Sequence, residues 1–267
     1  MKVEYSETKR RPQKKKRRKL SKIGKIIIAM VSILVVVAIT VMLMLTVFFN
    51  VSAVKVVGSS IYSYDEIIYA SGIMNGDNLM RLPSDDIEAR VERALPYVKK
   101  AEIIKSFPNT VGIKVTPATE SVLLETESGI YTADSDYKVL RSATDRPEGL
   151  LRIKGIKADS LKAGNLVKFS DKQQKKILKD ILDICSEQGF SVQYVNVSSL
   201  VDIGFLIDSH VYVKLGSYND LDSKMLHLAE VVKNFDKNAT ASISLENWSA
   251  SSKESTMKYE DISKYTE

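Results

Sequence analysis

The chain has 267 residues, of which 44% are hydrophobic and 27% charged, and its formal net charge is +6. This composition is typical of a globular protein with one or two packed domains, and it excludes collagen-like, fully disordered and disulfide-stapled proteins. Cys185 is the only cysteine and there are two histidines, which excludes an intramolecular disulfide and a multi-histidine metal site. We expect no metal, no cofactor and no catalytic residue.

The positive charge is concentrated in residues 1–25, which carry twelve Lys and Arg against two Glu, whereas the other 242 residues have a net charge of −4. Basic runs bind nucleic-acid phosphates, but this one contains no aromatic residue that could stack on a base. We therefore expect a cytoplasmic tail that sets membrane topology and contacts anionic lipid rather than nucleic acid. Its densest part is Lys14, Lys15, Lys16, Arg17, Arg18 and Lys19.

Residues 26–49 form a run of 24 uncharged residues, sixteen of which are Ile, Leu, Val or Phe. A helix of this length covers about 36 Å, enough to cross a hydrocarbon core of about 30 Å. The sequence predicts a transmembrane helix with the basic tail inside the cell and residues 50–267 outside it. A buried core helix is one alternative. A cleavable signal peptide is another, although its apolar region is shorter, at about 7 to 15 residues.

Residues 50–118 predict a small α+β module. A strand over 54–57 ends at Gly58, and Ser63 with Glu66 forms a capping box that opens a short helix. A second helix ends at Pro96, and two further strands follow. Phe107, Pro108 and Asn109 form the turn between those strands. The expected order is β-α-α-β-β, with two helices on one face of a three-stranded sheet.

Residues 119–248 predict a second domain, a mixed α/β domain of antiparallel strands with two amphipathic helices. The region 155–170 fits no strand pattern, and residues 249–267 are polar and predict a flexible tail. The expected elements are a hairpin over 122–131, a strand at 139–140, a helix over 170–189, a strand over 192–197, a hairpin over 203–215, a helix over 219–235 and a last strand over 242–245.

This arrangement resembles the FtsQ/DivIB family of bacterial cell division proteins, whose FtsQ-type POTRA domain follows a single membrane span. The positions that carry the resemblance are Gly58, Pro96 and Phe107-Pro108-Asn109, and residues 211–225 are similar to the family's β domain. The chain departs from the family pattern at Pro117-Ala118, where Glu-Arg is usual, and at Ser244 and Glu246, where Asp and Arg are usual.

The resemblance implies a non-enzymatic scaffold of the division machinery, located in the plasma membrane and enriched at the septum. Its expected partners are other single-span division proteins of the FtsL and FtsB/DivIC type, and through them it would regulate the septal peptidoglycan synthase. The alternative is an extracytoplasmic cell-wall hydrolase or transpeptidase acting through Ser135 or Cys185. Ser-x-x-Lys matches such as Ser135–Lys138 occur about as often as chance predicts, and Cys185 falls on an apolar helix face.

Sheets with an open edge bind other chains by strand addition. We expect one such edge in the first module, at residues 54–57 or 101–106, and another at the terminal strand, where Ile243 and Leu245 are candidate contact residues. Trp248, the only tryptophan, follows that strand. It fits an interface anchor and a cap on the domain's own core equally well.

Overall fold

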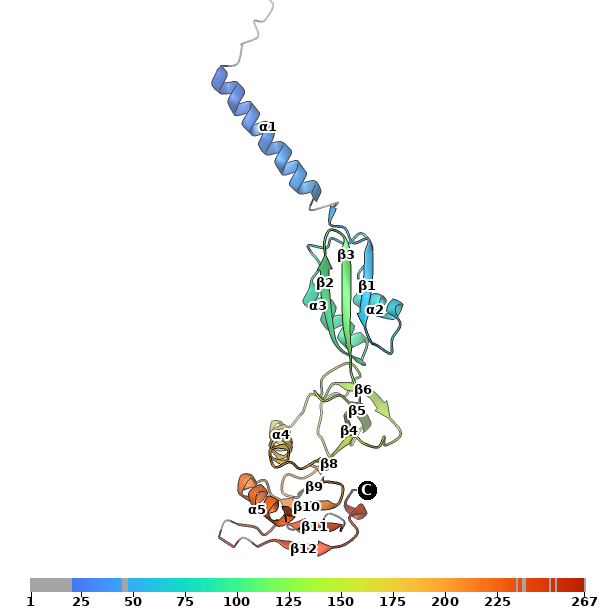
Figure 1. Cartoon of the computed structure of the whole chain (residues 1–267), viewed down its shortest axis with the longest axis vertical. Coiled ribbons are helices and arrows are strands. Elements are labelled where there is room, and N and C mark those ends of the chain that lie inside the picture. The colour runs from blue at the N-terminus through green and yellow to red at the C-terminus, as the bar shows by residue number, and fades with distance from the viewer. Residues whose placement is uncertain are drawn as a thin grey trace, which may run out of the picture.

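The computed structural model describes residues 21–44, 48–233, 235–236, 239–249, 251–252 and 254–266. The expected lipid-contacting run at 14–19 lies outside the described residues. Figure 1 shows an elongated molecule in which helix α1 comes first, a small sheet with two helices follows, and a larger sheet lies at the far end.

Helix α1 (Lys22–Leu43) projects away from the rest of the chain, and none of its side chains is buried. It is the one helix among the described residues that is long and apolar enough to cross a membrane. Its 22 residues span about 33 Å. Ser32 and Thr40 donate their hydroxyl protons to the Ile28 and Val36 carbonyls at 2.8 and 2.9 Å, which satisfies both hydroxyls inside the helix.

The next module has the β-α-α-β-β order that the sequence predicted. Parallel pairing of β1 with β3 and antiparallel pairing of β2 with β3 give the sheet order β1-β3-β2. The buried residues of both helices, β2 and β3 form one core, which includes Ile67, Val91 and Ile113, and Val54 and Val56 of β1 pack against it as partly buried side chains. The elements are β1 (Ala53–Gly58), α2 (Tyr64–Ser71), α3 (Ser84–Ala94), β2 (Val98–Ser106) and β3 (Thr110–Pro117).

The motif residues of this module have structural roles. Gly58 has a φ of +116°, and a Cβ there would clash with the Val115 carbonyl oxygen, so only glycine fits. Pro96 directly follows Leu95, the residue at which α3 ends. The peptide Phe107-Pro108 is cis in the turn between β2 and β3. The carbonyl of Asn109 accepts a hydrogen bond from Ser52 N–H at 2.9 Å, which starts the pairing of β1 with β3.

The second domain is a nine-stranded mixed sheet in the order β12-β11-β10-β9-β8-β7-β4-β5-β6. The core side chains of α4 and α5 pack with those of the strands in one large buried cluster. The elements are β4 (Val122–Thr126), β5 (Gly129–Ala133), β6 (Val139–Ala143), β7 (Leu151–Lys154), α4 (Lys172–Glu187), β8 (Val192–Asn196), β9 (Ile203–Ile207), β10 (Val211–Gly216), α5 (Leu221–Lys233), β11 (Ala241–Ser244), β12 (Thr256–Tyr259) and the short 3-10 helix η2 (Ser263–Tyr265).

The expectation of antiparallel strands needs correction, because three pairs are parallel: β4 with β7, β7 with β8, and β10 with β11. For two of these pairs the physical reason is a helix in the connection. Helix α4 joins β7 to β8 and α5 joins β10 to β11, and a helical crossover returns the chain to the end from which it started. The chain between β4 and β7 instead runs through β5 and β6, which form the outer strands beside β4.

The expectation of a flexible tail over 249–267 also needs correction. Thr256–Tyr259 forms β12, which pairs antiparallel with β11. Of this strand, Met257 packs on the domain core as a partly buried side chain, and the exposed Tyr259 ring stacks on that of Phe235, with centroids 5.7 Å apart. The main-chain hydrogen bonds to β11 rather than apolar burial hold the strand, and composition alone does not reveal them.

Several polar contacts join the two domains. Lys138 is buried, and its Nζ donates to the Val98 carbonyl at 2.6 Å. Val98 lies opposite Pro117, which has no N–H to offer that carbonyl. Burial lowers the pKa of the Lys138 ammonium. Outside this buried contact, Tyr97 donates to Glu120 at 2.6 Å, and the more exposed Lys99 pairs with Asp136 at 3.0 Å.

We predict that Lys138→Met costs about 1 to 3 kcal/mol of unfolding free energy, because the Val98 carbonyl loses its donor in a buried position. Lys99→Met is the matched control. It removes an exposed pair and should cost less than about 1 kcal/mol. Urea unfolding of the full chain in detergent micelles measures both changes, and equal losses for the two variants would contradict this account.

Candidate partner-binding edges

The outer strands of the two sheets are β1 and β2 in the small sheet and β6 and β12 in the large one. An outer strand presents main-chain N–H and C=O groups that can pair with a strand from another chain. Whether a given edge is available depends on whether the protein's own side chains or loops already occupy those groups.

The β2 edge is closed by α3. The N–H of Ala101 donates to the Glu92 carboxylate at 2.9 Å, and the N–H of Ile103 donates to the Glu88 carboxylate at 2.7 Å. These two glutamates are one turn apart on the same face of the helix, so they reach alternate residues of the strand. A partner strand could pair with β2 only by displacing both carboxylates.

The β1 edge is open. The N–H groups of Ala101 and Ile103 point away from β3, so residues 111, 113 and 115 of β3 direct their main-chain groups to β1. In the parallel register, where Val54 lies opposite Val111, these groups pair with Ala53, Lys55 and Val57, and the N–H groups of Val54 and Val56 point away from β3. No strand covers this side of β1 in the part of the chain that the structure describes. The Val57 side chain is 58% exposed beside this edge.

The β6 edge is partly closed by the loop before α4. Val139 N–H donates to the Asn165 carbonyl at 2.9 Å, and Gly164 N–H donates to the Val139 carbonyl at 2.8 Å. Val167 N–H also bonds to the Tyr137 carbonyl at 2.9 Å. This region, 155–170, fitted no strand pattern in the sequence, and its bridges to residues 137–139 give it a role as an edge cover.

The β12 edge is open, as the hydrogen bonds of β11 show. The Ala241 N–H donates to the His210 carbonyl at 3.1 Å and the Leu245 N–H donates to the Lys214 carbonyl at 2.8 Å, so both point towards β10. By alternation, Ser242 and Ser244 face β12, where they lie opposite Lys258 and Thr256.

It follows that Met257 and Tyr259 direct their N–H and C=O groups away from the sheet. No strand covers this side of β12 in the described part of the chain. The Tyr259 side chain is 69% exposed there.

The residues that the sequence placed at the terminal edge lie inside the domain. Ile243 and Leu245 are 0% exposed, and Trp248 is 8% exposed in the same core. The Trp248 ring lies 6.2 Å from the His227 ring, so it caps the domain's own core. The expectation that these three side chains contact a partner is therefore corrected. The edge of the sheet lies one strand further out, because β12 covers β11. The signal that could have found β12 is the strand-forming run Thr256-Met257-Lys258-Tyr259.

Residues 260–266, which we call the strap, fold back over the sheet. Tyr265 stacks on Tyr212 with ring centroids 4.6 Å apart, and Ile262 joins a buried cluster with Tyr194 and Tyr212. The Glu260 carboxylate accepts hydrogen bonds from Lys264, Ser242 and Tyr265, which lower its pKa to about 2. The strap thereby fixes the chain directly after β12.

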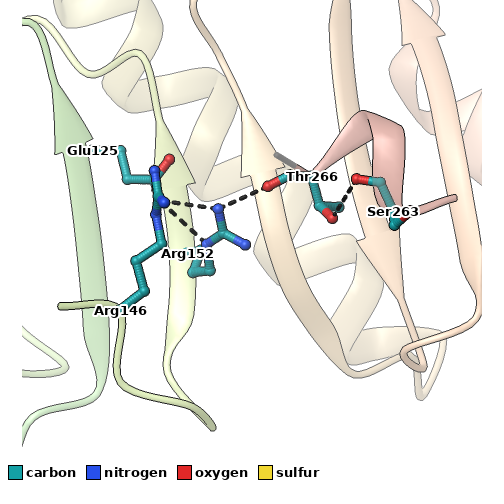
Figure 2. A network of polar contacts seen from close by, with 5 residues as sticks. All are labelled: Glu125, Arg146, Arg152, Ser263 and Thr266. Carbon is teal, nitrogen blue, oxygen red and sulfur yellow. Dashed lines mark hydrogen bonds and ion pairs between the residues drawn. The ribbon is translucent and has the colours of Figure 1, made fainter.

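The end of the strap is tied to β7 by Arg152, as Figure 2 shows. Its guanidinium donates to the Thr266 carbonyl at 2.7 Å and to the Glu125 carboxylate at 3.0 Å. Glu125 is buried and also accepts from Arg146 at 2.9 Å, so two arginines neutralise one carboxylate. Only Arg152 connects that carboxylate to the strap.

We predict that Arg152→Ala lowers the unfolding free energy by about 1 to 3 kcal/mol, because it removes charge-assisted hydrogen bonds at a buried carboxylate. Arg146→Ala, the matched control, leaves Glu125 paired and should cost less than about 1 kcal/mol. Thermal unfolding of the full chain compares them. A larger loss for Arg146→Ala would show that the strap contact does not matter.

The structure gives no support to the two nucleophile candidates. Cys185 is fully buried, and burial raises the pKa of its thiol to about 12, so the nucleophilic thiolate is scarce at neutral pH. The Ser135 hydroxyl contacts the ammonium of Lys99, which is paired with Asp136. In the described part of the chain, no three His, Cys, Asp or Glu side chains gather in a group that could hold a metal ion.

An exposed apolar helix, a β-α-α-β-β module and a mixed sheet with an open outer strand together define a membrane-anchored POTRA protein. The family model for the FtsQ-type POTRA domain matches residues 49–116. The chain thus has a POTRA domain of the FtsQ type and is similar to the cell division proteins FtsQ and DivIB.

Several relatives extend the similarity beyond this module. Cell division protein DivIB of Clostridium botulinum strain Hall is 22% identical over 226 residues, which cover 82% of this chain and 84% of that protein. Cell division protein FtsQ of Streptomyces venezuelae is 28% identical over 105 residues, or 39% of each chain. Cell division protein FtsQ of Corynebacterium glutamicum is 24% identical over 106 residues, covering 40% of this chain and 47% of that one.

Proposed function

We propose that this protein is a non-enzymatic, single-pass scaffold of the bacterial division machinery that binds other division proteins through the open edges of β1 and β12. The observation that supports this proposal most directly is the contrast among the four outer strands. Two are occupied by the protein's own glutamates or loop, and two keep unpaired main-chain groups. Strand addition uses such groups for affinity and the neighbouring side chains for selectivity.

The orientation that we propose follows from the flanks of α1. Twelve basic residues precede or begin this helix, and such residues resist translocation and stay in the cytoplasm. Both folded domains would then lie outside the cytoplasm. In this arrangement the POTRA module stands next to the membrane and β12 lies at the far end of the molecule (Figure 1).

The partners that we propose are single-span division proteins of the FtsL and FtsB/DivIC type, and through them the septal peptidoglycan synthase. The family name supports this step, since the relatives are called cell division proteins. The β12 edge suits an extended segment, because Tyr259 provides an exposed aromatic surface beside the unpaired main-chain groups. The strap holds β12 in place, so a partner segment meets an ordered strand.

The test at β12 compares two substitutions of one residue. Tyr259→Pro removes an N–H that points away from the sheet and leaves the Lys258–Ser242 pairing in place. Tyr259→Phe keeps that N–H and the ring. We expect Tyr259→Pro to reduce co-purification of FtsB/DivIC-type partners by at least about tenfold, the equivalent of 1.4 kcal/mol, and Tyr259→Phe to retain it. Equal co-purification by the two variants, both with wild-type melting temperatures, would refute this use of β12.

The test at β1 is analogous. Val56→Pro removes an outward N–H, and Val56→Ala shortens the side chain and keeps the N–H. If β1 accepts a partner strand, recruitment of a fluorescent fusion to the division site falls with Val56→Pro and persists with Val56→Ala. Loss of recruitment in both variants would point to the Val56 side chain instead of the strand edge.

A further inference from the structure

The segment 157–179, which joins β7 to the first half of α4, has a charge opposite to that of its surroundings. It contains seven lysines and two aspartates, a net charge of +5, whereas the rest of residues 50–267 carries −9. A solvated surface with mixed charges would show no such separation. The concentration of one sign in one segment is the feature that calls for a ligand.

Hydrogen bonds between the loop and α4 bring six of these lysines onto one surface. Ser170 N–H bonds to the Lys157 carbonyl at 2.9 Å, Asp159 N–H bonds to the Lys168 carbonyl at 3.0 Å, and Lys157 N–H bonds to the Gln174 side chain at 2.9 Å. These bonds place the loop lysines beside the first turn of α4. The helical lysines occupy positions i, i+3, i+4 and i+7 of one exposed face. We call this set the basic surface: Lys157, Lys168, Lys172, Lys175, Lys176 and Lys179.

Neither aspartate of the segment neutralises the basic surface. Asp171 caps α4 and accepts the N–H groups of Gln173 and Gln174. Asp159 accepts the Ser170 hydroxyl at 2.6 Å. None of the six lysines forms an ion pair among the described residues. The Lys175 ammonium lies over the Phe169 ring, 5.7 Å from the ring centroid, and this is the one head-group contact of the six lysines in the described part of the chain. The charges are therefore available to a ligand.

The charge distribution of α4 does not serve the stability of the helix. Its first two turns carry lysines, and the later turns carry Asp180, Asp183 and Glu187. The helix dipole favours the opposite order, acids near the N-terminus and bases near the C-terminus, by about 0.3 to 1 kcal/mol for each group. The lysines near the N-terminus of α4 therefore lower the stability of the helix slightly. Binding of a ligand would account for their position.

Membrane lipid does not fit this position. Figure 1 shows the POTRA strands running between α1 and the large domain, and β3 alone, with eight residues, spans about 26 Å. Electrostatic attraction is largely screened beyond about 10 Å at 0.1 M salt. An anionic leaflet at the end of α1 is therefore too far away to engage the basic surface.

An acidic protein segment fits less well than a phosphate polymer. Every cation in the basic surface is lysine, and no arginine occurs after Arg152. Protein interfaces are enriched in arginine and aromatic residues and depleted in lysine, because the guanidinium pairs with carboxylates in a fixed bidentate geometry. Mobile ammonium groups along a helix and a loop suit diffuse binding to a flexible chain of phosphates.

We propose that the basic surface binds a linear polymer with repeating phosphodiester groups outside the cytoplasm. The proposal rests on the proposed orientation only in one respect, namely the side of the membrane on which the protein meets the polymer. The binding itself can be measured with purified protein. At Lys168 the surface borders a cleft of about 880 Å³ between the domains, whose lining combines Arg93, Lys99 and Lys100 with the carboxylates of Glu92, Asp134 and Asp136. Because of these carboxylates, the proposed site is the basic surface and not the cleft.

The test uses the full chain in nanodiscs of zwitterionic phosphatidylcholine, with poly(glycerol phosphate) as the probe. An environment-sensitive dye on Gln173→Cys reports binding at the basic surface and not at the basic tail, and Cys185 is buried and does not react. The test variant is Lys172→Gln/Lys176→Gln/Lys179→Gln. The matched control, Lys55→Gln/Lys233→Gln/Lys258→Gln, removes three exposed lysines elsewhere.

We expect the test variant to reduce the slope of log affinity against log salt by about 2 and to weaken binding roughly 100-fold at 0.1 M salt, as three lost phosphate contacts would do. The control should bind like the parent. An equal loss in test and control would show a net-charge effect, and undiminished binding by the test variant would show that the surface is not a site. If polyglutamate of the same length binds as tightly, the ligand of the surface is an acidic protein segment and not a phosphate polymer. None of these outcomes depends on the division partners, so the scaffold proposal stands or falls separately.

Discussion

The constraint on which this structure depends is the pairing of main-chain groups at the outer strands of its two sheets. Each outer strand must be covered, paired within the chain or left for another chain, because unpaired N–H and C=O groups are a template for strand association. Glu88 and Glu92 cover β2 with carboxylates from α3, and the loop at 164–167 covers part of β6. Among the described residues, side chains and a loop thus cover β2 and part of β6, and no strand covers the outer side of β1 or β12.

The same constraint explains why the end of the chain is ordered. β12 is bonded to β11 on one side, and its composition would not hold it there by burial. The strap that follows supplies the missing stability through the Tyr265–Tyr212 stack and the bond from Arg152 to the Thr266 carbonyl. An edge strand that is fixed in this way presents its outward groups in one geometry, which lowers the entropic cost of binding a partner strand.

Much of this fold could be predicted from residue patterns. The capping box at Ser63 and Glu66 predicts the start of α2, and both reciprocal hydrogen bonds of that box are present. The apolar face of α4, with Ile177, Ile181 and Cys185, predicts its burial. These features depend on residues close together in the chain, so a local pattern contains the information that is needed.

The features that escaped prediction depend on contacts between distant segments. Strand β7 is four residues long, and β12 is held by a neighbouring main chain that no periodicity reveals. Glu88 and Glu92 resemble any solvated helix face until β2 is placed beside them. The sequence therefore placed the terminal edge on Ile243 and Leu245, one strand before the true outer strand. The outer strand in this region is β12.

The most direct test of the account is amide hydrogen exchange, measured residue by residue on the full chain without partners. The account predicts slow exchange for Ala101 and Ile103, whose N–H groups are held by carboxylates, and fast exchange for Val56 and Tyr259, which lie equally far out on their sheets but whose N–H groups point away from the neighbouring strand. Protection of Val56 and Tyr259 in the isolated protein, or fast exchange at Ala101 and Ile103, would contradict the division of the edges into closed and open.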